Sequence, residues 1–131
     1  MKFKKGDVIK TYMSNLTPPK EKYLIFLGNT KDQSLFAYVY INTGINFSVN
    51  GTQEKLDLQY PLGKYPFLSH GESFVNCASI HNYSYKIFVD NMIKNSGKIV
   101  GRISDIDLGK IVNLIKTTPN TPAKYKTEYN I

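Results

Sequence analysis

Apolar and polar residues follow β-strand patterns along the first third of the chain. The segment "GDVIKTYM" (6–13) places alternate residues on opposite faces of a strand. The run "YLIFLG" (23–28) is continuously apolar, which predicts a central strand that is buried on both faces. The run "LFAYVYINT" (35–43) follows a turn cluster and is the longest of the three. We therefore expect these three strands to form a meander.

The pattern is weaker in the middle of the chain. The segment "INFSVNG" (45–51) is typical of a short strand that ends in an Asn-Gly turn, and the alternation in "EKLDLQYPL" predicts another strand, stopped by Pro61. Further strand candidates are "SFVNCASI" (73–80) and "GKIVGRIS" (97–104), whereas the second half of "YSYKIFVDNMIKN" (83–95) predicts a short helix. The chain therefore has five to seven candidate strands.

The clearest helical pattern begins after Ser104. In "DIDLGKIVNLIKT" (105–117) the apolar residues recur at three- and four-residue spacing, which predicts an amphipathic helix. The Ser104 hydroxyl can accept a hydrogen bond from an early amide, and the acidic first turn suits the helix dipole. The tail "TTPNTPAKYKTEYNI" (117–131) has two prolines and little pattern. We expect residues 117–131 to be a flexible tail or an arm that docks on a partner.

Length and composition indicate one β-rich domain. The chain has 131 residues, which is enough for a single core, and it contains 10 Tyr and 7 Phe but no Trp. Aromatic and β-branched residues favour strands. The predicted fold is a β-rich α+β fold over residues 1–116, in which a small antiparallel β-barrel carries a C-terminal helix and one further short helix.

Membrane segments and cysteine chemistry are not expected. No apolar run approaches the roughly 20 residues that a membrane helix needs, and the basic start "MKFKKGDVIK" lacks the apolar segment of a signal peptide. Cys77 is the only cysteine, so it can form neither an internal disulfide nor a cysteine metal cluster. We expect a soluble, cytoplasmic protein without a metal or another cofactor.

The charge is strongly positive, and it has two interpretations. The formal net charge is +7, from 17 Lys+Arg against 10 Asp+Glu, which favours a polyanionic partner such as nucleic acid. Every cation except Arg102 is a lysine, however, and Asn and Ile are also abundant, as is typical of an AT-rich genome. Charge alone therefore leaves a nucleic-acid partner and a codon bias both open.

The loop before the second strand contains the strongest candidate for chemistry. In "SNLTPPKEK" (14–22), Pro18 and Pro19 restrict the backbone. Lys20 and Lys22 lie two residues apart at the entrance to a strand, so both project on the same side and could attract a phosphate. The alternative is that these lysines keep a sheet edge soluble and prevent strand pairing.

Three further polar residues are candidates. Asn42 and Thr43 end the third strand, where they could bind a phosphate oxygen or a base edge, or could cap the turn backbone instead. His70, in the predicted loop "FLSHGES" (67–73), could be a general acid or base near neutral pH, or a histidine that simply faces solvent. His70 and His81 have no carboxylate spaced like a zinc ligand set, so no metal site is predicted.

The order of these segments resembles the MazF/PemK (Kid) family of toxin endoribonucleases. Members of this family begin with a Gly-Asp-(Val/Ile) strand, here residues 6–8, and continue through a flexible loop into an apolar strand, here 23–27. A later strand corresponds to 73–80, and a Gly-x-(Ile/Leu)-Ser/Asp segment that opens a helix corresponds to 101–105. The match covers most of residues 3–115. It implies an SH3-like barrel, usually a homodimer, that cleaves single-stranded RNA without a metal.

The resemblance implies roles for four residues. The family has a catalytic Arg in an Arg-Pro pair at the start of the second apolar strand, where this chain has Lys22–Tyr23 and so keeps the charge without the planar guanidinium. The catalytic Thr or Ser of the family matches Thr43, and a one-residue shift would select Asn42. In the implied reaction the ribose 2′-hydroxyl attacks the adjacent phosphorus, Lys22 and Lys20 stabilise the phosphoryl charge, and Thr43 orients a phosphate oxygen.

The remaining implied contacts concern substrate and partners. Tyr60 and Tyr65 could stack on unpaired bases, or they could be packing residues, and His70 would be the acid or base. The implied partners are single-stranded RNA, an antitoxin protein and a second copy of the chain. The alternative function is a non-catalytic barrel of the same descent that binds a protein or nucleic acid, and the missing Arg-Pro pair and the tail motivate it.

Overall fold

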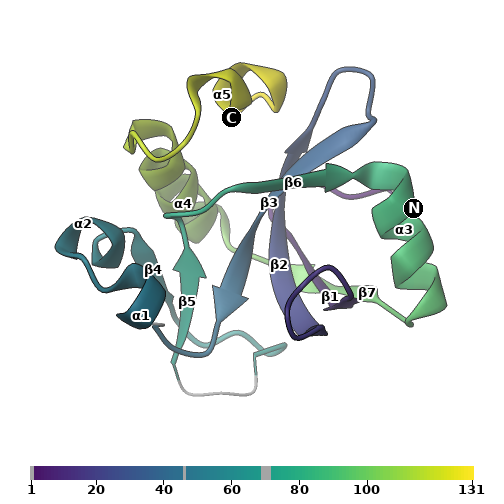
Figure 1. Ribbon diagram of the computed structural model, residues 1–131, viewed down its shortest axis with the longest axis horizontal. Helices are drawn as coiled ribbons and strands as arrows, with labels where there is room; N and C mark the ends of the chain where they lie inside the picture. The colour runs from purple at the N-terminus through teal and green to yellow at the C-terminus, as the bar shows by residue number, and fades with distance from the viewer. Residues whose placement is uncertain (1, 46, 69–71) are drawn as a thin grey trace.

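The computed structural model describes residues 2–45, 47–68 and 72–131, and it is built around one strongly curled antiparallel sheet with helices on both sides (Figure 1). The elements in chain order are β1 (Asp7–Met13), β2 (Lys20–Asn29), β3 (Leu35–Asn42), α1 (Phe47–Asn50), α2 (Gln53–Leu56), β4 (Gln59–Leu62), β5 (Ser73–Asn76), β6 (His81–Ser84), α3 (Tyr85–Lys94), β7 (Lys98–Arg102), α4 (Asp105–Thr117) and α5 (Ala123–Glu128).

The strands form a single sheet in the order β4-β5-β3-β2-β1-β7, and β6 pairs with β3 outside this path. The two short strands β5 and β6 use different halves of β3: β6 pairs with Leu35–Tyr38, and β5 pairs with Ile41 and Asn42. The first three strands are neighbours in the sheet, so the predicted meander is confirmed. The sheet curls strongly and forms half of a barrel. The prediction of a small α+β fold with a curled antiparallel sheet is confirmed to this extent.

The two central strands are buried on both faces, as the apolar run in β2 predicted. Side chains alternate between two clusters, so Leu24 and Phe26 pack on the α3 side while Ile25 and Leu27 pack on the α4 side. All four are at most 3% exposed. Each face therefore has its own core, and a residue's position along the strand determines which of the two it joins.

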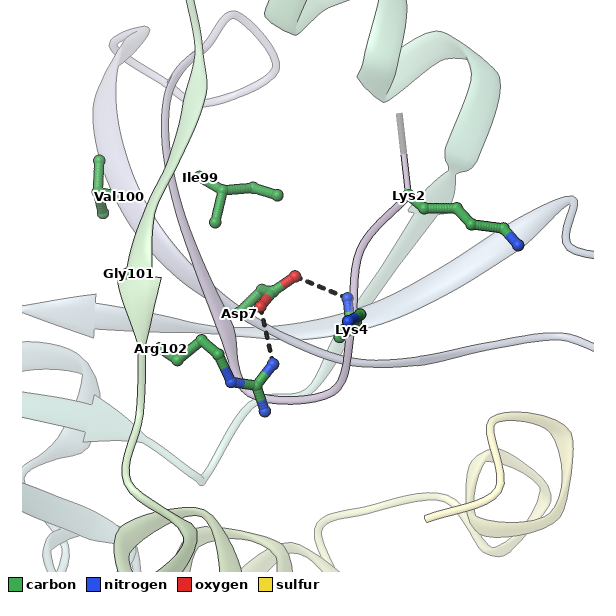
Figure 2. A pocket seen from close by; sticks show the side chains of 7 residues that line it. All are labelled: Lys2, Lys4, Asp7, Ile99, Val100, Gly101 and Arg102. Carbon is green, nitrogen blue, oxygen red and sulfur yellow. Dashed lines mark hydrogen bonds and ion pairs between the residues drawn. The ribbon is translucent and has the colours of Figure 1, made fainter.

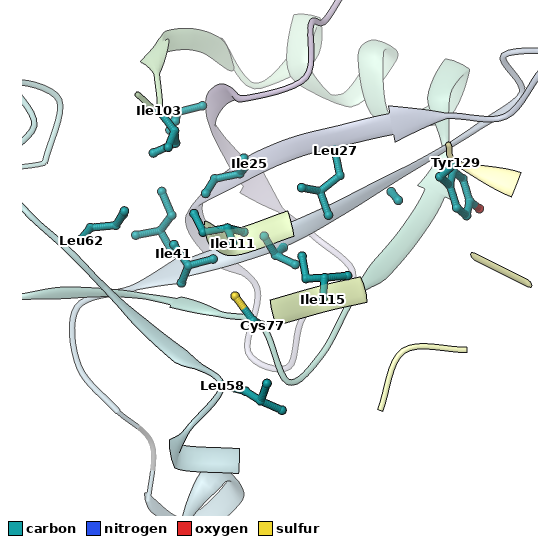
Figure 3. Packing of buried hydrophobic residues seen from close by; sticks show 14 residues of the cluster. Ile25, Leu27, Ile41, Leu58, Leu62, Cys77, Ile103, Ile111, Ile115 and Tyr129 are labelled. Atoms are coloured by element: carbon teal, nitrogen blue, oxygen red, sulfur yellow. The ribbon is translucent and has the colours of Figure 1, made fainter. Parts of the chain in front are cut away.

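The α4-side core is the larger of the two clusters (Figure 3). It is covered by α4, whose Ile111 and Ile115 are fully buried, and Ser104 caps this helix by accepting a hydrogen bond from the Asp107 amide at 3.1 Å. The predicted cap and apolar face are thus confirmed. Its buried members are Val8, Ile25, Leu27, Ala37, Val39, Ile41, Leu58, Leu62, Val75, Cys77, Ile103, Ile111, Ile115 and Tyr129.

The α3-side core is rich in aromatic rings, and it lies under α3 and the N-terminal segment. Phe36 is its centre, with the Phe88 ring 4.8 Å and the Phe26 ring 5.7 Å away between centroids. The aromatic side of this core continues along β3 toward Asn42. Its buried members are Phe3, Ile9, Met13, Leu24, Phe26, Phe36, Tyr38, Tyr40, Phe88 and Met92.

The middle of the chain differs from the sequence-based expectation. Residues 47–50 form helix α1 where a short strand was expected, and 53–56 form helix α2, whose N-cap Thr52 accepts a hydrogen bond from the Lys55 amide. The strand expected to stop before Pro61 instead includes it. A proline has no N–H to donate, and β4 tolerates one because it is an edge strand of the sheet.

Helix content was also underestimated. The expectation was one C-terminal helix and one further short helix, whereas the described residues form five. A helix was predicted only in the second half of residues 83–95, but helix α3 already starts at Tyr85. Ser84 caps it there by accepting a hydrogen bond from the Ile87 amide. Among the described residues, no helix has the length and apolar character needed to cross a membrane.

Residues 117–131 pack back onto the barrel of the same chain. Helix α5 is followed by Tyr129, which is only 1% exposed and belongs to the α4-side core. Its hydroxyl accepts a hydrogen bond from Asn82 Nδ2 at 2.9 Å. Gly28 permits the close approach, because a Cβ at that position would lie 2.4 Å from the Tyr129 carbonyl oxygen. The C-terminal segment thereby seals one end of the core.

Candidate functional site

Lys22 lies near the start of β2 on the α3 side of the sheet, where it is half-buried. The register places it opposite Thr11 of β1. On its other side, the Lys22 ammonium donates a hydrogen bond to Asn42 Oδ1 at the end of β3. The same ammonium lies 5.1 Å from the centre of the Tyr40 ring. Strand pairing thus brings together Lys22 and Asn42, which are distant in the sequence but were both candidates.

The charge on Lys22 is not balanced by a carboxylate. Among the described residues, the ion pairs are Lys10 with Glu21 and Arg102 with Asp7, and Lys22 belongs to neither. Burial lowers the pKa of Lys22, and the nearby positive charge of Lys20 lowers it further. The site is therefore electropositive, and burial makes the charge of Lys22 energetically costly.

An imidazole completes the site. His81, the first residue of β6, lies opposite Tyr38 in the register. Its ring stacks on Tyr38 at 5.5 Å and 21°, and it packs against Tyr40 at 4.9 Å between ring centres. Burial lowers the pKa of His81, and the charge of Lys22 lowers it further, so the neutral imidazole is favoured. Lys22 and His81 therefore share the Tyr40 ring as a common neighbour.

The two tyrosines are held as uncharged phenols. Tyr38 and Tyr40 are 2% and 8% exposed, and their hydroxyl oxygens lie 3.5 Å apart. Burial raises the pKa of both groups. Neither supplies a negative charge to Lys22 at neutral pH. The Tyr40 ring instead contacts both the ammonium of Lys22 and the imidazole of His81.

The other residues expected to act at this site lie in different positions. Lys20 is exposed at the first position of β2, and its charge acts on Lys22. Thr43 follows the end of β3 and is exposed, and the structure records no hydrogen bond between it and Lys22. Of the two alternatives at the strand end, Asn42 is thus the one that contacts the lysine. His70 lies outside the described residues.

Tyr60 and Tyr65 lie on the opposite side of the sheet from Lys22, packed against the α4-side core. Both phenols donate hydrogen bonds to the Asp107 carboxylate in the first turn of α4, Tyr60 at 2.6 Å and Tyr65 at 2.5 Å. Tyr65 also accepts a hydrogen bond from the Ser104 amide. These contacts tie β4 and the following loop to the start of α4, which supports the packing interpretation of the two tyrosines.

Replacing Asp107 with asparagine should lower the pKa of Tyr60. The hydrogen bond to the carboxylate is the main reason that this pKa is raised to about 12, because it stabilises the neutral phenol. Without the negative charge, the value should fall toward the ordinary 10 of tyrosine. The measurement is a pH titration by NMR of protein with ¹³C-labelled tyrosine, assigned with Tyr60→Phe. The exposed neighbour Asp105 provides the control, since Asp105→Asn should leave the titration unchanged; an unchanged value in Asp107→Asn would contradict the contact.

The single arginine of the chain, Arg102, lies far from Lys22. It lines a surface pocket of about 500 Å³, in which the Asp7 carboxylate lies between Arg102 Nη1, at 2.9 Å, and the Lys4 amide, at 2.7 Å (Figure 2). Asp7 is four residues before Thr11, the partner of Lys22, or about 13 Å along a strand. Arg102 is therefore engaged at the other end of β1 and does not replace the arginine that the resemblance led us to expect.

His81 is the main residue that the sequence interpretation missed. It was considered only as a metal ligand, together with His70. The signal that could have identified its neighbours was the alternation in β3, since Tyr38, Tyr40 and Asn42 must share one face. The pairing of β6 with β3 could not be read from four residues of sequence. No group of three or more potential metal-ligating side chains was found among the described residues.

No protein-family model matches the chain. No curated protein matches it either. By its fold, the chain is a small α+β protein with a strongly curled antiparallel sheet. The residues around Lys22 are the main evidence for its function.

Proposed function

We propose that this protein cleaves single-stranded RNA without a metal ion, as its resemblance to the MazF/PemK-like toxins implies, at the site centred on Lys22. One observation carries the proposal. The Lys22 ammonium is half-buried and has no carboxylate partner among the described residues, and it lies against the Asn42 carboxamide and the Tyr40 ring.

A phosphate group would satisfy this arrangement. Removing a cation from water is unfavourable unless an anion or hydrogen-bond acceptors compensate it, and among the described residues the Asn42 oxygen is the one acceptor of a hydrogen bond from Lys22. Because that oxygen accepts from Lys22, the Asn42 Nδ2 group remains a donor, and none of the described residues accepts from it. An ammonium and an amide N–H₂ side by side form a pair of donors suited to two oxygens of one phosphate.

The chemistry is transesterification. The ribose 2′-oxygen forms a bond to the adjacent phosphorus, the bond from phosphorus to the 5′-oxygen breaks, and the products are a 2′,3′-cyclic phosphate and a free 5′-hydroxyl. Lys22 would stabilise the negative charge that develops on the phosphoryl oxygens, and Asn42 would orient one of them. A 2′-hydroxyl is required as the nucleophile, so the substrate is RNA and not DNA.

The partners follow from the same proposal. A toxin of this type would be inhibited by an antitoxin protein, would act as a homodimer with an SH3-like barrel, and would meet its RNA in the cytoplasm. The net charge of +7 supports an RNA substrate, because a basic protein attracts a polyanion over long range.

One observation favours a non-catalytic barrel as the second candidate. The Lys22 ammonium already has an acceptor in Asn42 and an aromatic face in Tyr40, while Thr43 makes no hydrogen bond to it. Such a site would bind nucleic acid or protein without cutting it. This candidate predicts salt-dependent binding of RNA, or binding of a protein, with the RNA left intact.

The test is incubation of the purified protein with a mixed RNA pool in EDTA, followed by sequencing of the ends. We expect discrete cuts with 2′,3′-cyclic phosphate and 5′-hydroxyl ends. A Lys22→Ala/Asn42→Ala double variant, purified identically, detects contaminating ribonuclease and should leave the RNA intact. RNA that stays intact at a large excess of the wild-type protein would exclude the nuclease, and cuts by the double variant would exclude this site.

A further inference from the structure

His81 lies next to the Lys22 site, on another strand that borders β3. Its ring lies 4.9 Å from the Tyr40 ring, and Lys22 Nζ lies 5.1 Å from the same ring, so the imidazole and the ammonium flank one aromatic wall. Within residues 2–45, 47–68 and 72–131, no side chain or backbone group forms a hydrogen bond with the imidazole, and its nitrogens are not among the fully buried polar atoms that lack a partner. Among the described residues, the ring nitrogens of His81 therefore have no hydrogen-bond partner, and they reach solvent beside the half-buried lysine.

We propose that His81 is the general base of the RNA cleavage at the Lys22 site and that the Lys22 ammonium is the general acid. This assignment rests on the proposed ribonuclease function. The imidazole takes the proton of the 2′-hydroxyl as the 2′-oxygen bonds to phosphorus. The 5′-oxygen leaves with a proton from the Lys22 ammonium. The resulting imidazolium and amine return to their starting states by exchanging protons with water.

The surroundings of His81 suit a base. It is faced by Tyr38 and Tyr40 from β3 and by Lys22 from β2, and Tyr83 lies on β6 itself. The two β3 phenols are kept neutral by burial, and among the described residues Lys22 is the charged group that lowers the pKa of the imidazole. Burial and this positive charge hold the imidazole unprotonated at neutral pH, which is the form that accepts a proton.

The stacked position of His81 also limits its motion. The ring is parallel to Tyr38 within 21°, and it is tilted by 60° to Tyr40, so two buried side chains fix its plane. A base held in this way needs no reorganisation to meet a ribose that enters beside Lys22. The same packing explains why a substitution must preserve the ring shape if the base alone is to be tested.

The experiment compares the wild type with His81→Phe, which keeps an aromatic ring but has no proton acceptor. Single-turnover cleavage should fall about 10²–10⁴-fold, the usual contribution of general acid–base catalysis. Binding of an uncleavable 2′-deoxy substrate analogue, measured by fluorescence anisotropy, should change little. The wild-type rate should fall as pH decreases through an apparent pKa below 6.5, because protonated His81 cannot act as base, and His81→Phe should lose this limb.

Two further measurements separate the outcomes. Free imidazole should partly restore cleavage by His81→Ala, which a purely structural role does not predict. NMR titration of the His81 ring should give a pKa that rises in Lys22→Met, and this readout needs no cleavage. Wild-type cleavage that His81→Phe leaves unchanged would overturn the base assignment alone. A wild-type protein that does not cut RNA refutes both proposals. An unshifted His81 pKa in Lys22→Met refutes the joint action of Lys22 and His81 as acid and base.

Discussion

Lys22→Met is expected to lower the rate of RNA cleavage by about 10²–10³-fold, the loss that follows when one donor to a developing oxyanion is removed. Methionine has an unbranched apolar side chain of similar length, but it has no charge to place against the Tyr40 ring. The stability of the fold should not decrease, because a half-buried cation without an anionic partner is lost. The measurements are single-turnover cleavage and urea unfolding of the same preparations.

The combination of lower activity and undiminished stability is the informative result. A residue kept for packing or for solubility loses stability or solubility when it is replaced, whereas a functional residue in a costly environment shows the opposite trade-off. Lys116→Ala, at an exposed position in the last turn of α4 on the other side of the sheet, is the matched charge control and should cleave as the wild type does. A Lys22→Met variant that cleaves at the wild-type rate would exclude Lys22 from the chemistry.

Lys22→Arg tests how far the site resembles the family. Arginine keeps the charge and adds the planar guanidinium, so phosphoryl charge can still be stabilised. It is always protonated near neutral pH, so it cannot act as the general acid that we infer for Lys22. We expect Lys22→Arg to cleave more slowly than the wild type but faster than Lys22→Met. An arginine variant as slow as the methionine variant would mean that proton transfer, and not charge, is the main contribution of Lys22.

The elements that the sequence predicted well are those with a strong local pattern. The continuous apolar run of β2 can be accommodated only where both faces of a strand are buried, and the register shows that both faces are. In α4, the cap at Ser104 and the spacing of Ile111 and Ile115 act within a few residues of one another. Such signals need no knowledge of the rest of the chain.

The elements that the sequence mispredicted are short and depend on distant contacts. Residues 54–62 alternate over too few positions to separate a helix from a strand, and in the structure they contribute to both α2 and β4. Strand β6 has only four residues, and its strand conformation depends on pairing with Leu35–Tyr38 of β3. Local sequence contains no information on that partner. The secondary structure of residues 54–62 and of β6 could therefore be assigned only from the three-dimensional structure.

The site also combines features that the local sequence predicts with features that depend on distant contacts. Strand geometry alone predicted that Lys20 and Lys22 project on the same side. The contact of Lys22 with Asn42 instead of Thr43 follows from the face of the sheet that Asn42 shares with Lys22. The contact between His81 and Tyr40 joins residues on two strands whose pairing was not predicted. The Asp107 contacts of Tyr60 and Tyr65 depend in the same way on how α4 lies across β4.

The largest stability effect is expected at the C-terminal segment. Tyr129→Ala should destabilise the fold by about 3–5 kcal/mol, the usual cost of removing a large buried ring from a core. The ring is 1% exposed, belongs to the α4-side core and packs edge-on against Tyr125 at 5.5 Å. Urea unfolding gives the free energy. Tyr129→Phe, which loses only the hydrogen bond from Asn82, should cost about 0.5–1.5 kcal/mol.

A second pair of variants tests whether the loss comes from docking of the tail. Gly28→Ala would place a Cβ 2.4 Å from the Tyr129 carbonyl oxygen, so β2 and the tail must separate, at a typical overpacking cost of about 1–3 kcal/mol. Gly63→Ala is the control, since a Cβ there meets nothing within 4 Å. If the tail docks, Tyr129→Ala removes most of the penalty of Gly28→Ala, because the carbonyl is then free to move away. Additive losses in the double variant would mean that the penalty of Gly28→Ala does not come from the docked tail. A Tyr129→Ala variant as stable as the wild type would mean that residues 117–131 contribute little to the core.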